Sequence, residues 1–436
     1  MQDDLMHLTA SQLQERLQSR ELSVAELAKA CLERIEARDS AVRAWAHVDR
    51  ELVLAQAREL DRTLVRGPLH GLPIGIKDVI LTKDMPTQYN SPIYRDSHPT
   101  MDAACVTILR AAGALILGKT TTVEFGATGR KPPTRNPHDL KRTPGGSSSG
   151  SAAAVADLHV PLALGTQTGG SIIRPASYCG VFAMKPTWNR VSNEGARRFS
   201  PSLDTIGWFA RSAEDLALLF QVFDPDSSAH SIAEPHELRI GLYRPTAWGT
   251  TEQATQAALA AAEQRLRDAG VHVEELTLPS DFDALVDEHR LIMLTEARSS
   301  FLAEFRTHYE LLHESFREQV ENRNGYTYES LRAAYDHAAK CRSIFDRIAA
   351  DFDAILAPST VGEAPVGLAD TGSFAFNGPW TLLHVPCINV PCYWTKDGLP
   401  VGLTLVGPRF SDERVLGTAV RIAMLFGIRD SARWRP

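Results

Sequence analysis

Short apolar segments of strand length alternate with helical segments along most of the chain, and this alternation limits the folds that it can adopt. An apolar helical pattern at 103–113 leads into the strand-like ALILGKTT at 114–121, and SAAAVADLHVPLALGT at 151–166 repeats the order. The alternation resumes at 238–278 and closes with two apolar segments and a helix at 388–427. The sequence therefore predicts an α/β fold of α/β/α layers, with a large central mixed β-sheet covered by helices.

Helix boundaries are indicated by capping residues. Thr9 with Gln12, and Ser23 with Glu26, have the spacing of capping boxes at the start of two N-terminal helices. Asp102 precedes the helical segment at 103–113, so we expect its side chain to be the N-cap there.

The chain of 436 residues is long for one domain, but large α/β enzymes reach this size around a single sheet. The polar segment DPDSSAHSIAEPH at 224–236 is the clearest interruption. Because strand and helix patterns continue after it, and no repeat of fixed period is visible, we interpret it as a connecting loop. We predict a single domain over residues 1–436.

Composition excludes several classes of protein. The net charge of −7 disfavours sequence-independent binding of nucleic acid, which needs a basic surface. The six cysteines form no CxxC pair, as is typical of reduced thiols in a cytosol, and the fourteen histidines show no metal-ligand spacing. No signal peptide and no apolar run of about 18 residues is present. We predict a cytoplasmic protein without a metal, a nucleic-acid partner or a membrane partner.

The stretch KRTPGGSSSGSAAAVA at 141–156 places four serines between glycines and a helical segment. Gly145 and Gly150 have the spacing of a phosphate-binding loop, but Ser151 stands where that loop has its lysine and Ala152 where it has a hydroxyl. A flexible linker would stay polar, whereas this segment leads directly into an alanine-rich helix and an apolar strand. The remaining interpretation is nucleophile chemistry, with a serine hydroxyl presented by the loop.

A second cluster, GTQTGGS at 165–171, again follows an apolar strand. Ser171 stands behind Gly169 and Gly170, where unhindered backbone N–H groups can converge on a developing oxyanion. A serine hydroxyl needs a base to become a nucleophile. Two candidate serine loops therefore require a base from elsewhere in the chain.

Three residues are candidates for that base. His159 is close in sequence, but as a lone histidine it fits a structural role better. Lys77 follows the apolar run LPIGI, which carries it into the interior, where burial lowers the pKa of a lysine. From the residues alone, a catalytic Lys77 and a structural ion pair with Asp78 are equally good interpretations. Lys185 in VFAMKPT raises the same question.

Three segments in a fixed order carry a family resemblance: GLPIGIKD at 71–78, TPGGSSSGSAAAVA at 143–156 and ALGTQTGGSIIRPASYCGVFAMKPT at 163–187. Together they closely resemble the amidase signature family of serine hydrolases, with a core signature at about 70–190. The resemblance extends over most of the chain and implies hydrolysis of an amide bond without a cofactor.

The resemblance also implies the catalytic residues. Ser171 matches the nucleophile of the family, Ser147 the bridging serine and Lys77 the general base, so the peptide bond between Gly146 and Ser147 is expected to be cis. The reaction would pass through an acyl-enzyme. The implied oxyanion hole consists of the backbone N–H groups of Thr168, Gly169, Gly170 and Ser171.

The chain departs from the common signature at two places. Gln167 stands where the family has aspartate, and Ile173 where it has arginine, with Arg174 one residue later. The two departures go together, because an ion pair between that aspartate and that arginine near the nucleophile would lose both its geometry and its charge. Because these positions support the loop, we still expect activity.

The substrate is not determined by these motifs. We expect small aryl or alkyl amides or carbamates (a urethanase activity), a pocket built largely from residues 280–380, and contacts from Tyr89 and Trp380. The expected partner is this small molecule, with a second copy of the chain in a homodimer. The alternative is the glutaminase subunit of a tRNA-dependent amidotransferase. A second alternative is an inactive binding protein on the same scaffold.

Overall fold

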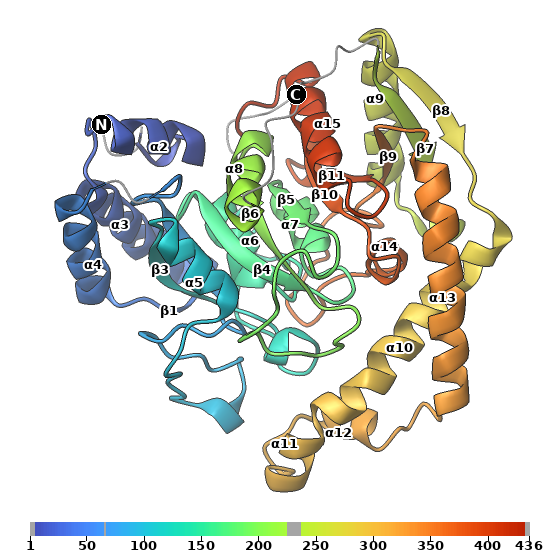
Figure 1. Ribbon diagram of the computed structural model, residues 1–436, viewed down its shortest axis with the longest axis horizontal. Helices are drawn as coiled ribbons and strands as arrows, with labels where there is room; N and C mark the ends of the chain where they lie inside the picture. The colour runs from blue at the N-terminus through green and yellow to red at the C-terminus, as the bar shows by residue number, and fades with distance from the viewer. Residues whose placement is uncertain (1–4, 65–66, 225–236, 432–436) are drawn as a thin grey trace.

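The computed structural model describes residues 5–64, 67–224 and 237–431, and the described chain is built around one eleven-stranded mixed sheet (Figure 1). The strand order is β1-β3-β2-β4-β6-β5-β10-β11-β9-β7-β8. This confirms the predicted α/β fold. The strands are β1 (Trp45–His47), β2 (Pro73–Lys77), β3 (Leu115–Thr120), β4 (Leu162–Gln167), β5 (Phe182–Lys185), β6 (Thr205–Ala210), β7 (Arg239–Tyr243), β8 (His272–Leu276), β9 (Ala354–Pro358), β10 (Cys387–Trp394) and β11 (Pro400–Val406).

Both strand orientations occur in this sheet. β2 is parallel to β3 and β4, and β7 is parallel to β8 and β9, whereas β6, β5, β10 and β11 form antiparallel pairs. β2, β3, β5 and β6 are buried over their whole length. Strands covered on both faces are largely apolar, which is why these segments are apolar runs in the sequence, each of β2, β3 and β5 with a single buried lysine.

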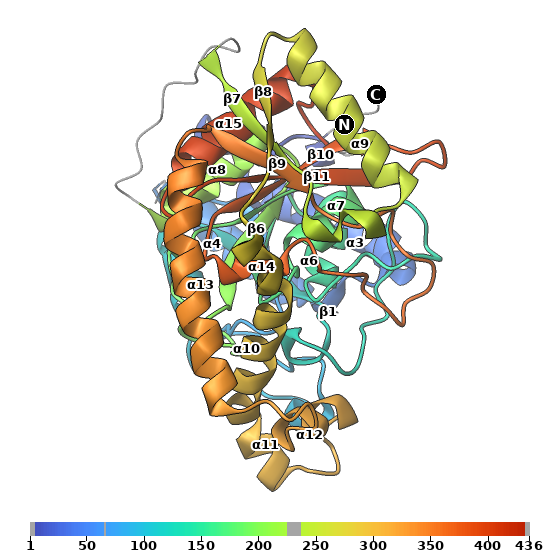
Figure 2. The ribbon, with the colours of Figure 1, turned by 90° about the vertical axis from the view of Figure 1, so that its right-hand side faces the viewer.

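Helices cover the sheet on both faces (Figures 1 and 2). They are α2 (Ala10–Gln18), α3 (Val24–Val42), α4 (Arg50–Arg62), α5 (Ala104–Ala111), α6 (Ser149–Ala156), α7 (Ile173–Cys179), α8 (Ala213–Phe223), α9 (Gln253–Asp268), α10 (Leu285–Ser300), α11 (Leu302–Thr307), α12 (Glu314–Val320), α13 (Tyr328–Ala349), α14 (Gly378–Leu382) and α15 (Asp412–Leu425). Short 3₁₀ turns lie at Pro92–Tyr94, Glu124–Gly126, Thr246–Thr250 and Ser280–Ala284.

The capping predictions are confirmed for two helices and wrong for a third. Thr9 opens α2 and Ser23 opens α3, each with a complete capping box. At α5 the N-cap is Ala103, without a side-chain cap. The Asp102 carboxylate instead accepts a hydrogen bond from the Lys83 N–H at 2.9 Å. A contact with a neighbouring loop thus replaces the local cap.

Helices α10 to α13 extend away from the sheet as an arm (Figures 1 and 2). α10 packs against α13, α12 and α14. α10 also reaches the loop that follows β4, because His289 Nε2 lies 2.8 Å from the carbonyl oxygen of Thr168.

The predicted connector at 224–236 lies, apart from Asp224, outside the described residues, and the single-domain organisation stays a prediction. Among the described helices, none is long and apolar enough to cross a membrane.

Candidate active site

The ends of two parallel strands bring the predicted residues together. Lys77 is the last residue of β2, and Thr168 directly follows β4. β2 and β4 are hydrogen-bonded in parallel, from Ile74 opposite Leu162 to Ile76 opposite Leu164. Because the carboxyl ends of parallel strands meet at one edge of a sheet, Lys77 and the second Gly-Ser loop lie at the same place.

Lys77 is fully buried, and its amine is held by hydroxyl groups. Its Nζ donates to Ser147 Oγ at 2.8 Å and to Thr166 Oγ1 at 2.7 Å. Burial lowers the pKa of Lys77 well below the usual 10.5, while the negative charge of Asp204 acts in the opposite direction. A neutral amine in contact with a serine hydroxyl can accept its proton.

The first Gly-Ser loop turns sharply at Ser147. The peptide bond between Gly146 and Ser147 is cis, as the resemblance implies, and Ser147 is buried. Ser148 Oγ donates to the carbonyl of Thr166 at 3.2 Å, and Ser149 Oγ donates to the carbonyl of Gly145 at 2.8 Å. The first bond anchors the loop to β4 and the second closes the loop on itself, and the Ser147 hydroxyl meets Lys77.

Ser171 lies between β4 and α7 and lines a pocket of about 350 Å³. The lining includes the loop that ends at Ser171, residues of α10 and the segment around Phe374. The polar and charged lining residues include Lys131, Arg174, Arg290, Gln319 and Asp370. Ser171 therefore opens to a space that can hold a small polar molecule.

Backbone N–H groups in the second Gly-Ser loop are available to a ligand. Within the described residues, those of Gly169, Gly170 and Ser171 donate to no other group of the chain. A Cβ at Gly170 would lie 2.5 Å from Asn377 Oδ1, so only glycine fits there. The loop thus combines unused donors with close packing behind it.

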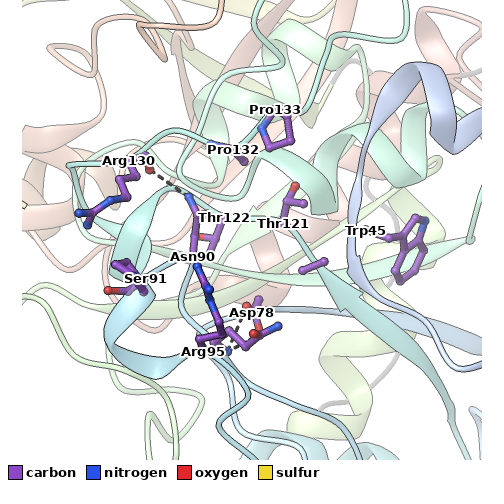
Figure 3. A pocket seen from close by; sticks show the side chains of 13 residues that line it. Trp45, Asp78, Asn90, Ser91, Arg95, Thr121, Thr122, Arg130, Pro132 and Pro133 are labelled. Carbon is purple, nitrogen blue, oxygen red and sulfur yellow. Dashed lines mark hydrogen bonds between the residues drawn. The ribbon is translucent and has the colours of Figure 1, made fainter. Parts of the chain in front are cut away.

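A larger hollow of about 500 Å³ lies beside Asp78, the neighbour of Lys77 (Figure 3). Its wall includes Asn90, whose side chain donates to the carbonyl of Arg130 at 3.1 Å. Asp78 itself is engaged with buried Lys119, whose Nζ lies 3.5 Å from Asp78 Oδ1. Lys77 is therefore not the partner of its sequence neighbour, and its amine contacts Ser147 and Thr166 instead.

The other candidate bases are occupied elsewhere. Lys185 Nζ donates to the backbone carbonyls of Val385 at 2.5 Å and Pro186 at 3.1 Å. His159 Nδ1 accepts a hydrogen bond from Trp45 Nε1 at 3.1 Å. Both side chains are buried in structural contacts, and of the three candidates only Lys77 contacts a serine of the Gly-Ser segments.

Comparison with known proteins identifies the family. The model of the family described as Amidase matches residues 26–416 of this chain. The chain belongs to the amidase family. It is therefore an enzyme that hydrolyses carbon–nitrogen bonds of amides.

Both curated relatives and solved structures match this amidase over nearly its full length. A glutamyl-tRNA(Gln) amidotransferase subunit from Chloroflexus aggregans is 36% identical, covering 95% of this chain and 95% of that protein. The corresponding protein from Roseiflexus castenholzii, which has the same name, is 37% identical, covering 94% of each. The crystal structure of an amidase superposes with a TM-score of 0.86 at 29% identity, covering 95% of this chain and 98% of that one.

These relatives correct one prediction. We expected an enzyme whose only partners are a small amide or carbamate and a second copy of itself. That expectation is wrong, because the relatives, similar over almost the whole chain, are named as one subunit of a larger enzyme. The sequence motifs describe the reaction centre, and they carry no information about assembly.

The departures from the signature are compensated in the amidase. Gln167 Oε1 accepts hydrogen bonds from the N–H groups of Ile172 at 2.9 Å and Ile173 at 3.1 Å, as an aspartate at the start of α7 would. Arg174 donates to the carbonyl of Gly146, in the cis peptide, at 2.6 Å and to that of Gly372 at 2.7 Å. Both side chains support the loops, as expected.

The two aromatic residues predicted to contact substrate lie outside the described lining of the pocket at Ser171. Tyr89 packs against Tyr94 and Phe125 and lines a different hollow. Trp380 packs in the core between Tyr243 and Phe345. Aromatic side chains fit core positions equally well, and nothing in their local sequence distinguishes the two roles.

Sequence reasoning missed the charged residues of the pocket. Arg290 comes from α10, and Asp370 from the segment before α14. Both fall inside the predicted pocket region of 280–380. No motif surrounds them, however, so only a known fold indicates which positions in that region face Ser171.

Proposed function

We propose that this amidase is the glutamine-hydrolysing subunit of an amidotransferase and that it works with partner chains. The choice of glutamine as substrate is supported by two residues of opposite charge, Arg290 and Asp370, which line the pocket at Ser171. Glutamine combines a carboxamide with a carboxylate and an ammonium group, so Arg290 and Asp370 each find a counterpart of opposite charge. The similarity to curated subunits over nearly the full chain supports the assembly.

The proposed chemistry begins with the contact between Lys77 and Ser147. Neutral Lys77 takes the proton of Ser147, which takes that of Ser171 as the Ser171 oxygen attacks the amide carbon. The backbone N–H groups of Thr168, Gly169, Gly170 and Ser171 stabilise the oxyanion. The proton returns through Ser147 to the leaving nitrogen, and ammonia departs.

Deacylation uses the same groups. Water attacks the ester carbonyl of the acyl-enzyme and gives up its proton through Ser147 to Lys77. When the tetrahedral intermediate collapses, Ser171 is released and regains a proton, and the carboxylic acid product leaves. The same N–H groups stabilise both tetrahedral intermediates.

Removing a charge from the pocket tests whether glutamine is the substrate. Arg290→Gln should raise KM for glutamine about 10-fold or more, because a charged hydrogen bond is lost, with little change in kcat. The KM for a neutral primary amide such as butyramide should not change. The control is Arg306→Gln, at an exposed arginine on α11 away from the pocket. An unchanged KM for glutamine in Arg290→Gln would contradict the proposed carboxylate contact.

The assembly is tested with the full chain. We expect weak glutamine hydrolysis by the isolated chain and a faster rate from the complex purified with its partners from the native cells. Ammonia and glutamate are measured together, since hydrolysis yields them in equal amounts. Hydrolysis of butyramide but not of glutamine by that complex would overturn the proposal.

A further inference from the structure

The oxyanion loop is held through its carbonyl oxygens. Among the described residues, the one cis peptide bond is Gly146–Ser147, so the peptide units of the loop after β4 are trans. In a trans unit the carbonyl and the following N–H point in opposite directions. A donor that fixes the carbonyl of one residue therefore also aims the N–H of the next residue.

His289 fixes the first of these units. Its Nε2 lies 2.8 Å from the carbonyl oxygen of Thr168, and because that oxygen can only accept, Nε2 carries the proton. The ring is 1% exposed, and burial lowers its pKa to about 4, so it is neutral near pH 7. Phe374 packs against the ring with centroids 5.8 Å apart. The N–H aimed by this contact belongs to Gly169.

Thr381 fixes the second unit. Its Oγ1 lies 2.8 Å from the carbonyl oxygen of Gly169 and 3.1 Å from that of Asn377, so its one proton is donated over the shorter distance, to Gly169. The residue is 1% exposed. The hydroxyl is oriented from behind, because Gln167 Nε2 donates to the same oxygen at 3.0 Å. The N–H aimed by this contact belongs to Gly170.

Two further contacts hold the same loop. The carbonyl of Gly170 accepts the N–H of Arg174 at 2.9 Å, which aims the N–H of Ser171. The side chain of Thr168 donates to Asp204 Oδ1 at 2.5 Å. All three carbonyls are thus held from the side opposite to the N–H groups.

We propose that His289 and Thr381 are positioning residues that preorganise the oxyanion hole by holding the carbonyls of Thr168 and Gly169. This inference rests on the proposed role of Ser171 and its loop, but not on glutamine as the substrate. It assigns a function to α10 and α14, which contribute one side chain each. It also gives Gln167 a role, because the Gln167 side chain orients the hydroxyl of Thr381.

The test is an isosteric pair at position 381. Thr381→Val keeps the shape and removes the hydroxyl, so labelling of Ser171 by a fluorophosphonate should slow about 10-fold, part of the cost of losing one oxyanion donor. Thr381→Ser keeps the hydroxyl and should label at the wild-type rate. The matched control is Thr418→Val, because Thr418 is also buried but donates within its own helix, to the carbonyl of Arg414.

Substitutions of His289 are the second part of the test. His289→Phe should slow labelling by a similar factor, and His289→Gln, which retains an N–H donor, should restore part of it. With any amide that the enzyme turns over, the loss should appear in kcat and leave KM within about 2-fold. Thermal unfolding of each variant separates misfolding from loss of position.

Two results would overturn the inference. One is a wild-type labelling rate in both Thr381→Val and His289→Phe. The other is an equal loss in Thr381→Ser or Thr418→Val, which would indicate packing rather than the hydroxyl. Failure of glutamine hydrolysis would leave this test intact, because the label reports on Ser171 without a substrate.

Discussion

Ser171→Ala should abolish amide hydrolysis, with a loss on the order of 10⁶-fold in kcat, because it removes the atom that would form the acyl-enzyme. The residue lines the pocket and precedes α7, and its substitution removes a single hydroxyl. The variant should therefore fold normally and bind substrate. Product release measured by mass spectrometry, together with loss of fluorophosphonate labelling, checks both parts of the expectation.

The control lies in the first Gly-Ser segment. Ser151 is fully buried, and its Oγ donates to the carbonyl of Leu164 in β4 at 2.8 Å. Ser151→Ala removes a structural hydrogen bond, so we expect lower stability by about 1 kcal/mol and retained turnover. If Ser171→Ala kept a tenth of the wild-type rate, or if Ser151→Ala lost labelling as well, the assignment of the nucleophile would be wrong.

The sheet and the loops at its edge could be predicted because their signals are local. β2 and β3 are buried on both faces, so their apolar runs are visible in the sequence without knowledge of their neighbours. The capping boxes at Thr9 and Ser23 are local in the same sense. The cis peptide at Ser147 followed from resemblance. The residues alone left a catalytic and a structural Lys77 equally possible and did not exclude Lys185 as the base.

Features that depend on distant segments could not be predicted. Arg290 reaches the pocket because α10 packs against α14, about ninety residues later in the chain, and this packing has no local signature. Asp102 has the sequence of an N-cap, but it bonds Lys83 instead. His289 and Thr381, which contact the carbonyls of Thr168 and Gly169 in the loop after β4, likewise come from the distant helices α10 and α14.

Lys77→Met should lower kcat by about 10²- to 10⁴-fold near neutral pH, the usual contribution of a general base. Methionine has nearly the length of lysine, so the buried space stays filled, but Ser147 loses the amine that contacts it at 2.8 Å. The measurement is the rate of ammonia release over a range of pH, with thermal unfolding of the same variant as the check on folding.

The pH profile carries the mechanistic information. Only the neutral amine accepts a proton, so wild-type activity should rise with pH through the pKa of Lys77 and stay constant above it. Because burial lowers that pKa well below 10.5, the plateau should begin at a pH where an exposed lysine would still be charged. In Lys77→Met this rise should disappear, since the titrating group is gone.

Lys185→Met is the matched control, because Lys185 is equally buried and its pKa is also lowered by burial. Within the described residues, however, its amine donates hydrogen bonds to backbone carbonyls and to no side chain. We expect it to change stability while leaving the rise of activity with pH in place. Burial alone would then be insufficient for catalysis, and contact with the serine would distinguish the two lysines. If Lys185→Met removed the rise and Lys77→Met did not, Lys185 would be the base and the proton path through Ser147 would have to be abandoned.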